Sequence, residues 1–288
     1  MLRREFLAML ASVAAAPVFA ANEPGIQLGA PAEFTTDVVR KLAIEKARKP
    51  YKPQPLIPDA WQNLSYDEYR MIWFDSRNAL WQKEQETPLK VDVFPPGLYY
   101  PRAVKTFAVS DGQARAMQFD LNVFDRSDMF PEVPIDDTLG YSGLRLRSEL
   151  REPGIFEEFA VFQGASYFRG IGTGQTYGLS ARGLAIRTGD PAGEEFPDFT
   201  HFWIEQPEPG ASSVVMHCLL DSPSCTGAYR FEIVHGETLV MNVETEIFAR
   251  TDLTHVGIAP LTSMYLFDDM DRNRFDDFAP QSMTATGC

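Results

Sequence analysis

Residues 228–250, AYRFEIVHGETLVMNVETEIFAR, carry the pattern that decides the fold class. Aromatic and β-branched residues alternate with polar ones on both sides of His235-Gly236-Glu237, which is typical of two antiparallel strands joined by a short turn. Similar runs precede this hairpin: EEFAVFQGASYFRGIG (157–172), FTHFWIEQP (199–207) and SSVVMHCLLDSP (212–223). No helical period longer than a turn or two separates them. The sequence therefore predicts an all-β fold, a large antiparallel β-sandwich rather than an α/β fold.

The chain before residue 71 has a different character. Residues 34–51 place apolar side chains at helical spacing, with Thr36 as candidate N-cap and Pro50 as the stop. The prolines of KPQPLIPDAWQNLSYDEYR (52–70) predict an extended connector and then a short helix from about Ser65. We therefore expect short N-terminal helices and a proline-rich connector over residues 21–70, and the sandwich over residues 71–280.

The N-terminal residues 1–20 have the features of a signal peptide. Arg3 and Arg4 precede Phe6, Leu7 and an apolar run that ends in a small-x-small cleavage site before Ala21. The run is too short to span a bilayer stably. The Arg-Arg-x-Phe-Leu pattern is the twin-arginine variant, which exports folded proteins, and an ordinary Sec signal is the alternative. The sequence predicts a periplasmic protein.

Length and composition describe a globular protein with an acidic surface. The chain has 288 residues, of which 44% are hydrophobic and 12% aromatic, and its formal net charge is -14. A surface of this charge repels phosphate backbones and anionic lipids, so we expect no nucleic-acid partner and no binding to membrane surfaces. Neutral and cationic partners remain open.

Motifs for metals, cofactors and covalent catalysis are not found in the sequence. The four histidines are scattered rather than two to four residues apart, namely His201, His217, His235 and His255. We therefore expect no zinc site. The glycine-rich GIGTGQTYG (170–178) lies between predicted strands with no helix after it, so a phosphate loop is not expected either. The sequence predicts no cofactor.

The cysteines leave two readings open. Cys218 and Cys225 could close a short disulfide loop in an oxidising compartment, or they could pack as two thiols. Cys288 ends the chain in a segment without strand or helix character.

Carboxylates and aromatic rings gather on two predicted loops. TGDPAGEEFPDF (188–199) holds four acids, which are Asp190, Glu194, Glu195 and Asp198. LLDSPSCTGAYRF (219–231) places Asp221 at a strand end, with Tyr229 nearby. Carboxylates that bind hydroxyls and rings that stack on apolar sugar faces are typical of sugar sites, and glycoside hydrolysis needs two carboxyl groups of separated pKa. The alternative is that these acids are ordinary solvated loop residues.

Four long, irregular stretches carry a family resemblance. They are GASYFRGIGTGQTYGLSARGLAI (164–186), GEEFPDFTHFWIE (193–205), LLDSPSCTGAYRF (219–231) and GIAPLTSMYLFDD (257–269). From about Phe34 to Pro280 the chain resembles the periplasmic glucan biosynthesis proteins of the G/D family, which act on the β-1,2-glucan backbone of osmoregulated periplasmic glucans. The arginine pair at the N-terminus resembles the D type.

The resemblance implies a sandwich of the galactose-mutarotase-like, supersandwich type with a glucan cleft, followed by a smaller immunoglobulin-like domain. It implies an inverting endo-β-1,2-glucanase that works without a cofactor. The alternative function is a non-catalytic carbohydrate-binding module that presents β-1,2-glucan to membrane-bound modifying enzymes.

Eight residues are the candidates for glucan contacts. They are Tyr167, Arg169, Tyr177, Arg182, Glu194, Glu195, Asp221 and Tyr229. Their polar groups could hold sugar hydroxyls, and an arginine offers a bidentate fork. The structural alternatives are that the tyrosines cap the sandwich core and that Arg182 is the buried partner of Glu194 or Glu195.

The resemblance also implies a catalytic acid in a Val-His-Asp-Ser-Asp-Gly-Leu-like segment just after Pro280. This sequence reads QSMTATGC (281–288) there, and a one-base shift of the reading frame, with suitable third codon positions, converts it into that segment. We therefore expect residues 281–288 to be a frameshifted tail, with the acid, the later strands and the immunoglobulin-like domain absent. A sandwich cut in this way exposes strand edges and apolar faces, so we expect an inactive and poorly soluble product.

Overall fold

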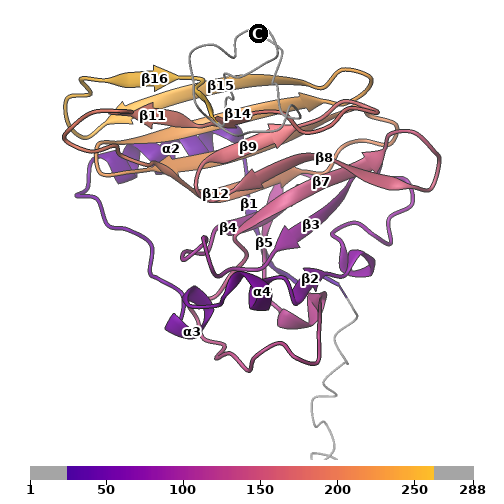
Figure 1. Ribbon diagram of the computed structural model, residues 1–288. Coiled ribbons are helices and arrows are strands. Elements are labelled where there is room, and N and C mark those ends of the chain that lie inside the picture. The colour runs from indigo at the N-terminus through magenta and orange to yellow at the C-terminus, as the bar shows by residue number, and fades with distance from the viewer. Residues whose placement is uncertain (1–24, 263–288) are drawn as a thin grey trace, which may run out of the picture.

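Residues 25–262, which the computed structural model describes, form a sandwich of two β-sheets with short helices outside it (Figure 1). The predicted all-β class is confirmed. The larger sheet has seven strands in the spatial order β1 (Leu28–Glu33), β5 (Gln113–Met117), β4 (Lys105–Ser110), β12 (Asp198–Glu205), β13 (Ser213–Asp221), β14 (Cys225–Val234) and β15 (Val240–Ala249).

The smaller sheet has six strands in the spatial order β17 (Leu261–Thr262), β10 (Ser180–Arg182), β9 (Tyr167–Gly170), β8 (Phe156–Gln163), β7 (Gly143–Glu149) and β3 (Lys90–Phe94). Two short ribbons accompany the sheets, β11 (Leu184–Ile186) with β16 (Val256–Ile258), and β2 (Ile72–Phe74) with β6 (Phe124–Arg126).

The hairpin predicted around His235 is confirmed. β14 and β15 pair antiparallel from Cys225↔Ala249 to Val234↔Val240, and β13 pairs antiparallel with the other side of β14. The prediction of antiparallel pairing is incomplete at one place, because β4 and β12 are parallel, with His201 opposite Lys105. The chain between them runs through the smaller sheet, so β12 returns by a long crossover rather than by a hairpin turn.

Aromatic rings fill the space between the two sheets. Phe162 of β8 meets Phe231 of β14 edge to face, with 5.1 Å between the ring centroids, and Phe199 meets Phe202 at 5.8 Å. Alternate residues of β14 are buried, which is the period of two that the sequence shows. β15 differs, since Val240 and Val243 are 46% and 44% exposed at this edge of the larger sheet.

The predicted N-terminal helix is α2 (Thr36–Ala47), which lies on the side of the larger sheet that faces away from the smaller one (Figure 1). Val39 and Ala43 are buried against the sheet, together with Trp203. The N-cap is Thr35 rather than the predicted Thr36, because Thr35 still has extended backbone angles, φ -141° and ψ 159°.

The proline-rich connector holds more structure than predicted. Pro58 precedes a single helical turn, α3 (Asp59–Gln62), which buries Trp61. The predicted short helix is α4 (Tyr66–Tyr69), and Ser65 and Glu68 form a reciprocal capping box at its start. β1 was not predicted either; its LGAPAE sequence lacks β-branched residues, yet it pairs with β5.

The cysteine alternatives are resolved in favour of packed thiols, because Cys218 and Cys225 are both buried and unbridged. The predicted signal peptide (1–20), the tail (281–288) and Cys288 lie outside the described residues. Among the helices of residues 25–262, none is long and apolar enough to cross a membrane. In the same range, no group of three or more histidine, cysteine or acidic side chains could hold a metal ion.

Candidate functional site

The outer face of the smaller sheet, meaning its side away from the larger sheet, carries charged and aromatic side chains. Phe162 and Phe168 pack into the sandwich core, so by strand alternation their neighbours Val161 and Arg169 point outward. Arg145 pairs with Val161, and Tyr167 pairs with Arg182 in the next strand. An acidic protein thus places several arginines on one sheet face.

Arg182 lies between two aromatic rings on this face. Its guanidinium carbon is 5.5 Å from the ring centroid of Tyr167 and 4.8 Å from that of Phe196. Arg182 Nη1 pairs with Glu194 Oε1 at 2.5 Å, which holds the pKa of Glu194 below its usual value. The Nε and Nη2 groups of Arg182 are buried and have no hydrogen-bond partner in residues 25–262. Two donors of a buried cation are therefore unsatisfied within the described residues.

Arg169 and Tyr177 form a second cluster on the same face. The guanidinium of Arg169 lies 4.1 Å from the ring centroid of Tyr177, whose hydroxyl donates to Glu158. Burial and the neighbouring Glu158 raise the pKa of Tyr177, so the phenol stays protonated. Arg145 links this cluster to the sheet, with Nη1 3.5 Å from Glu158. Ring faces and charged hydrogen-bonding groups alternate along the outer face.

Glu195 and Tyr229 hold neighbouring loops in place. Glu195 accepts hydrogen bonds from the Ser224 amide at 2.9 Å and the Ser224 hydroxyl at 2.6 Å. Burial opposes the ionisation of Glu195, but the hydrogen bonds from Ser224 and Ser222 outweigh it and lower its pKa. Tyr229 is buried and donates its hydroxyl hydrogen to the Gly183 carbonyl at 2.7 Å. Both side chains are occupied by contacts within the fold.

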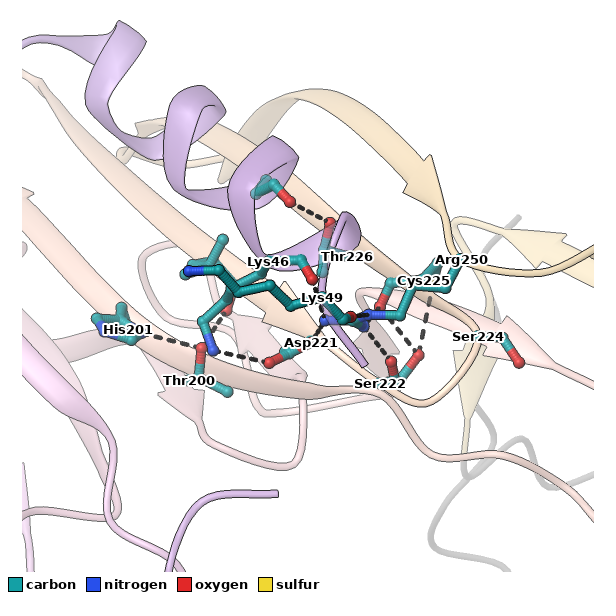
Figure 2. Close-up of polar contacts among 12 residues, drawn as sticks. Lys46, Lys49, Thr200, His201, Asp221, Ser222, Ser224, Cys225, Thr226 and Arg250 are labelled. Carbon is teal, nitrogen blue, oxygen red and sulfur yellow. Dashed lines mark hydrogen bonds and ion pairs between the residues drawn. The ribbon is translucent and has the colours of Figure 1, made fainter. Parts of the chain in front are cut away.

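Asp221 belongs to an ion network that ties α2 to the larger sheet (Figure 2). Its carboxylate lies 2.9 Å from Lys46 Nζ and 2.8 Å from Arg250 Nη2, and its side chain is 4% exposed. Arg250 also donates to the carbonyls of Lys46 and Lys49, the last turn of the helix and the residues after it. The structure thus places Asp221 in a helix anchor, apart from the Arg182 and Arg169 clusters.

Asp198 is a further titratable group that was not among the eight candidates. It begins β12 and lines a small pocket of 80 Å³ together with Tyr99, Arg102 and Gly164. Burial raises its pKa to about 6, which the charge of Arg102 opposes and that of Asp221 reinforces. No hydrogen bond from another residue in the range 25–262 holds its carboxylate. A half-buried carboxylate with a raised pKa in a pocket is typical of a functional site.

The Asp198 pocket lies next to the outer face. Gln163, two residues after Val161 in β8, accepts a hydrogen bond from Tyr100 at 2.5 Å, and Tyr100 lines the pocket. The sequence did place Asp198 in its acidic cluster, directly after Pro197 and before an apolar strand. Its burial depends on residues about a hundred positions away, which the local pattern does not show.

Comparison with known proteins gives a consistent set of relatives. The family model described as "Periplasmic glucan biosynthesis protein, MdoG" matches residues 34–287. The protein named "Glucans biosynthesis protein G" of Rhodopseudomonas palustris strain BisA53 is 44% identical over 292 residues, which cover 99% of this chain and 56% of the relative. The protein of that name from Bradyrhizobium diazoefficiens is 43% identical, covering 96% of this chain and 55% of the relative.

A protein of the same name from Vibrio cholerae strain O395 is 44% identical over 256 residues, covering 88% of this chain and 47% of the relative. The chain thus spans about half the length of the curated relatives that it matches. These relatives carry the G-type name, so the D type, which rests on Arg3 and Arg4, stays a prediction.

Proposed function

Because the chain belongs to the MdoG family of periplasmic glucan biosynthesis proteins, we propose that it acts in the periplasm on the β-1,2-glucan backbone of osmoregulated glucans. Export through the twin-arginine signal of residues 1–20 is part of this proposal. The backbone lies along the outer face of the smaller sheet, where Tyr167, Arg169, Tyr177 and Arg182 contact it.

The observation that carries the proposal is the setting of Arg182. The Arg182 guanidinium lies between the rings of Tyr167 and Phe196, and its Nε and Nη2 have no partner within residues 25–262. The site therefore combines ring surface with N–H donors, and a sugar binds to both kinds of group. Aromatic rings cover the apolar face of a pyranose, and fixed N–H donors bind its hydroxyl oxygens. Phe196 is 57% exposed, so its ring is open to a ligand. Glu194 orients the guanidinium from the far side.

Glu195, Asp221 and Tyr229 support the site without direct contact with the glucan. Glu195 and Tyr229 fix the segments around Ser224 and Gly183, and Asp221 fixes α2. We assign these three residues to supporting the site rather than to touching the glucan.

The chemistry proposed for the family is inverting hydrolysis of the glucan backbone. This needs a base to activate water and an acid to protonate the leaving oxygen, with the two carboxyl groups about 6.5–9.5 Å apart. Asp198 has the character of the base, because a carboxylate with a pKa of about 6 is ionised at neutral pH and still accepts a proton readily. The acid is expected in a Val-His-Asp-Ser-Asp-Gly-Leu-like segment, which the family resemblance places just after Pro280. The 288-residue chain alone is therefore proposed to bind glucan without cleaving it.

The alternative is a module that binds glucan and presents it to membrane-bound modifying enzymes. The ion pair and rings around Arg182 favour binding, and they would serve either function equally. The two functions differ in what happens to the glucan.

Incubation with linear β-1,2-glucan separates these functions. The 288-residue chain and a version that carries Val-His-Asp-Ser-Asp-Gly-Leu and the following frame are each incubated with the polymer, and chain length and reducing ends are measured. Shortening only by the restored version supports the glucanase. If the restored version retains glucan on an affinity gel without shortening it, the presenting module is supported. Absence of glucan binding by both versions contradicts the proposed function.

A further inference from the structure

A second pocket lies at the end of the sandwich where β5 leaves β4. The two strands pair from Ser110↔Gln113 only as far as Phe107↔Ala116, whereas β5 pairs with β1 along its whole length, from Glu33↔Gln113 to Leu28↔Met117. The gap between the parted strands is bounded on its other side by residues 137–141. The resulting pocket has a volume of 380 Å³, which lies within the range of small-molecule sites.

The pocket contains a buried hydroxyl without a partner. Thr106 of β4 lines the pocket and is 2% exposed, and its Oγ1 makes no hydrogen bond to any residue in the range 25–262. An unpaired buried hydroxyl costs about 1–3 kcal/mol, so such groups are rare unless water or a ligand satisfies them. Thr106 Oγ1 is therefore the polar atom of this pocket that a bound ligand or a water would satisfy.

The rest of the lining combines rings with polar groups. Phe119 and Tyr141 supply ring surface. The Tyr141 hydroxyl is already used, because it donates to the Gln118 carbonyl at 2.9 Å, so the residue offers only its ring. At the rim stand one cation and one anion, Lys105 and Asp137, so the pocket has no excess of either charge. This composition suits a neutral ligand with an apolar face and several hydroxyls, which is a sugar ring.

The pocket adjoins the pocket of Asp198. Both are lined by Gln54, Ala103 and Val104, so the same short segment forms a wall of each. A chain of sugars that passes Asp198 can therefore continue across this segment and place a further unit beside Thr106. We propose that the Thr106 pocket is an additional subsite that holds one neutral sugar unit of the glucan, beyond Asp198 and away from the outer face; this inference rests on the proposed function.

Met117 provides a direct probe of the pocket, because it lines the pocket and is 7% exposed. The 288-residue chain is labelled at its methionine methyl groups, and Met117 is assigned from the signal lost in Met117→Leu. Linear β-1,2-glucans of increasing length are titrated in, with Met216 of the sandwich core as internal reference. We expect glucans that reach the pocket to shift the Met117 signal, while short ones that fill only the outer face leave it unchanged.

Thr106→Val is the matching substitution, and Thr238→Val at an exposed position is its control. Loss of one hydrogen bond should weaken binding of the long glucans about threefold to tenfold, and leave binding of the short ones unchanged. The melting temperature should stay level or rise, because valine removes an unpaired buried hydroxyl.

The outcomes distinguish the two proposals. If the unsubstituted chain binds no β-1,2-glucan of any length, the proposed function fails, and the subsite with it. If it binds glucan but Met117 does not shift, or Thr106→Val binds long glucans as tightly as the control, the subsite alone is overturned.

Discussion

Replacing Arg182 by methionine should separate recognition of glucan from stability of the fold. Arg182 Nε and Nη2 are buried donors without partners, and each net hydrogen bond to a sugar hydroxyl contributes about 1 to 1.5 kcal/mol. Loss of both hydrogen bonds therefore weakens glucan binding by about 2 to 3 kcal/mol, which is a roughly 30- to 150-fold lower affinity. Arg182→Lys should lose most of this as well, because a lysine cannot offer the planar fork.

Substitution of Arg182 should change the free energy of unfolding far less than it changes the affinity for glucan. Methionine keeps the apolar contacts with Tyr167 and Phe196, and the double variant Arg182→Met/Glu194→Gln leaves no charge without its partner. Replacing both members of a buried ion pair is often neutral or stabilising by about 1–4 kcal/mol, so the double variant should unfold no more easily than the unsubstituted chain. Arg40→Met removes an exposed arginine of α2 that pairs with Glu246, so it serves as the matched control and should bind normally.

The assay is isothermal titration with linear β-1,2-glucan, accompanied by urea unfolding of each variant. Equal affinity of Arg182→Met and the unsubstituted chain would refute the role of Arg182 in recognition. So would a collapse of stability in the double variant that matches the loss of affinity, because Arg182 would then be a structural residue.

Three further predictions concern the helix anchor, Asp198 and the exposed edge. Asp221→Asn should lower the free energy of unfolding by about 3–5 kcal/mol in urea titrations, because it leaves Arg250 buried without a counter-charge; a change under 1 kcal/mol would contradict the anchor. Asp198 binds its proton more tightly in the folded state, with a pKa of about 6 against 3.8, so its contribution to stability is lost as the pH rises from 4 to 6. Asp198→Asn should therefore raise the melting temperature at pH 7 and not at pH 4, and equal gains at both pH values would refute the raised pKa. Val243 of β15 and Ile258 of β16 are exposed apolar side chains, so Val243→Thr and Ile258→Lys should increase the fraction of protein that stays soluble after centrifugation. An unchanged soluble fraction would contradict this prediction.

The sequence predicted the parts of the fold that depend on neighbouring residues. Period-two alternation marked β14 and β15, and His235-Gly236 marked the turn between them. The helical period marked α2, although its cap was displaced by one residue. These features arise from local backbone preferences and from which side of an element is buried, so they are visible in a short window.

Features that depend on contacts between distant segments could not be predicted from the sequence. The parallel pairing of β4 with β12 joins Lys105 to His201 across a crossover that no local pattern specifies. One of the two partners of Asp221 is Lys46, which lies 175 residues earlier in the chain. Asp198 is the sharpest case, because its raised pKa comes from burial in a pocket shared with Arg102. Local composition predicted an acidic cluster but not which acid would have a raised pKa.

The grouping of the candidate residues was predicted in part. The sequence offered Glu194 and Glu195 as alternative partners of Arg182, and the structure selects Glu194. It could not separate the residues that face outward from those that support the fold, because Tyr167 and Tyr229 look alike in sequence and differ only in what surrounds them.

Hydrogen exchange with and without linear β-1,2-glucan tests the central claim, that the outer face of the smaller sheet binds the glucan backbone. We predict slower exchange of amides in β9, β10 and residues 190–198 when glucan is present, with α2 and β14 unchanged. Protection confined to α2 and β14, or no protection by saturating glucan, would contradict the account.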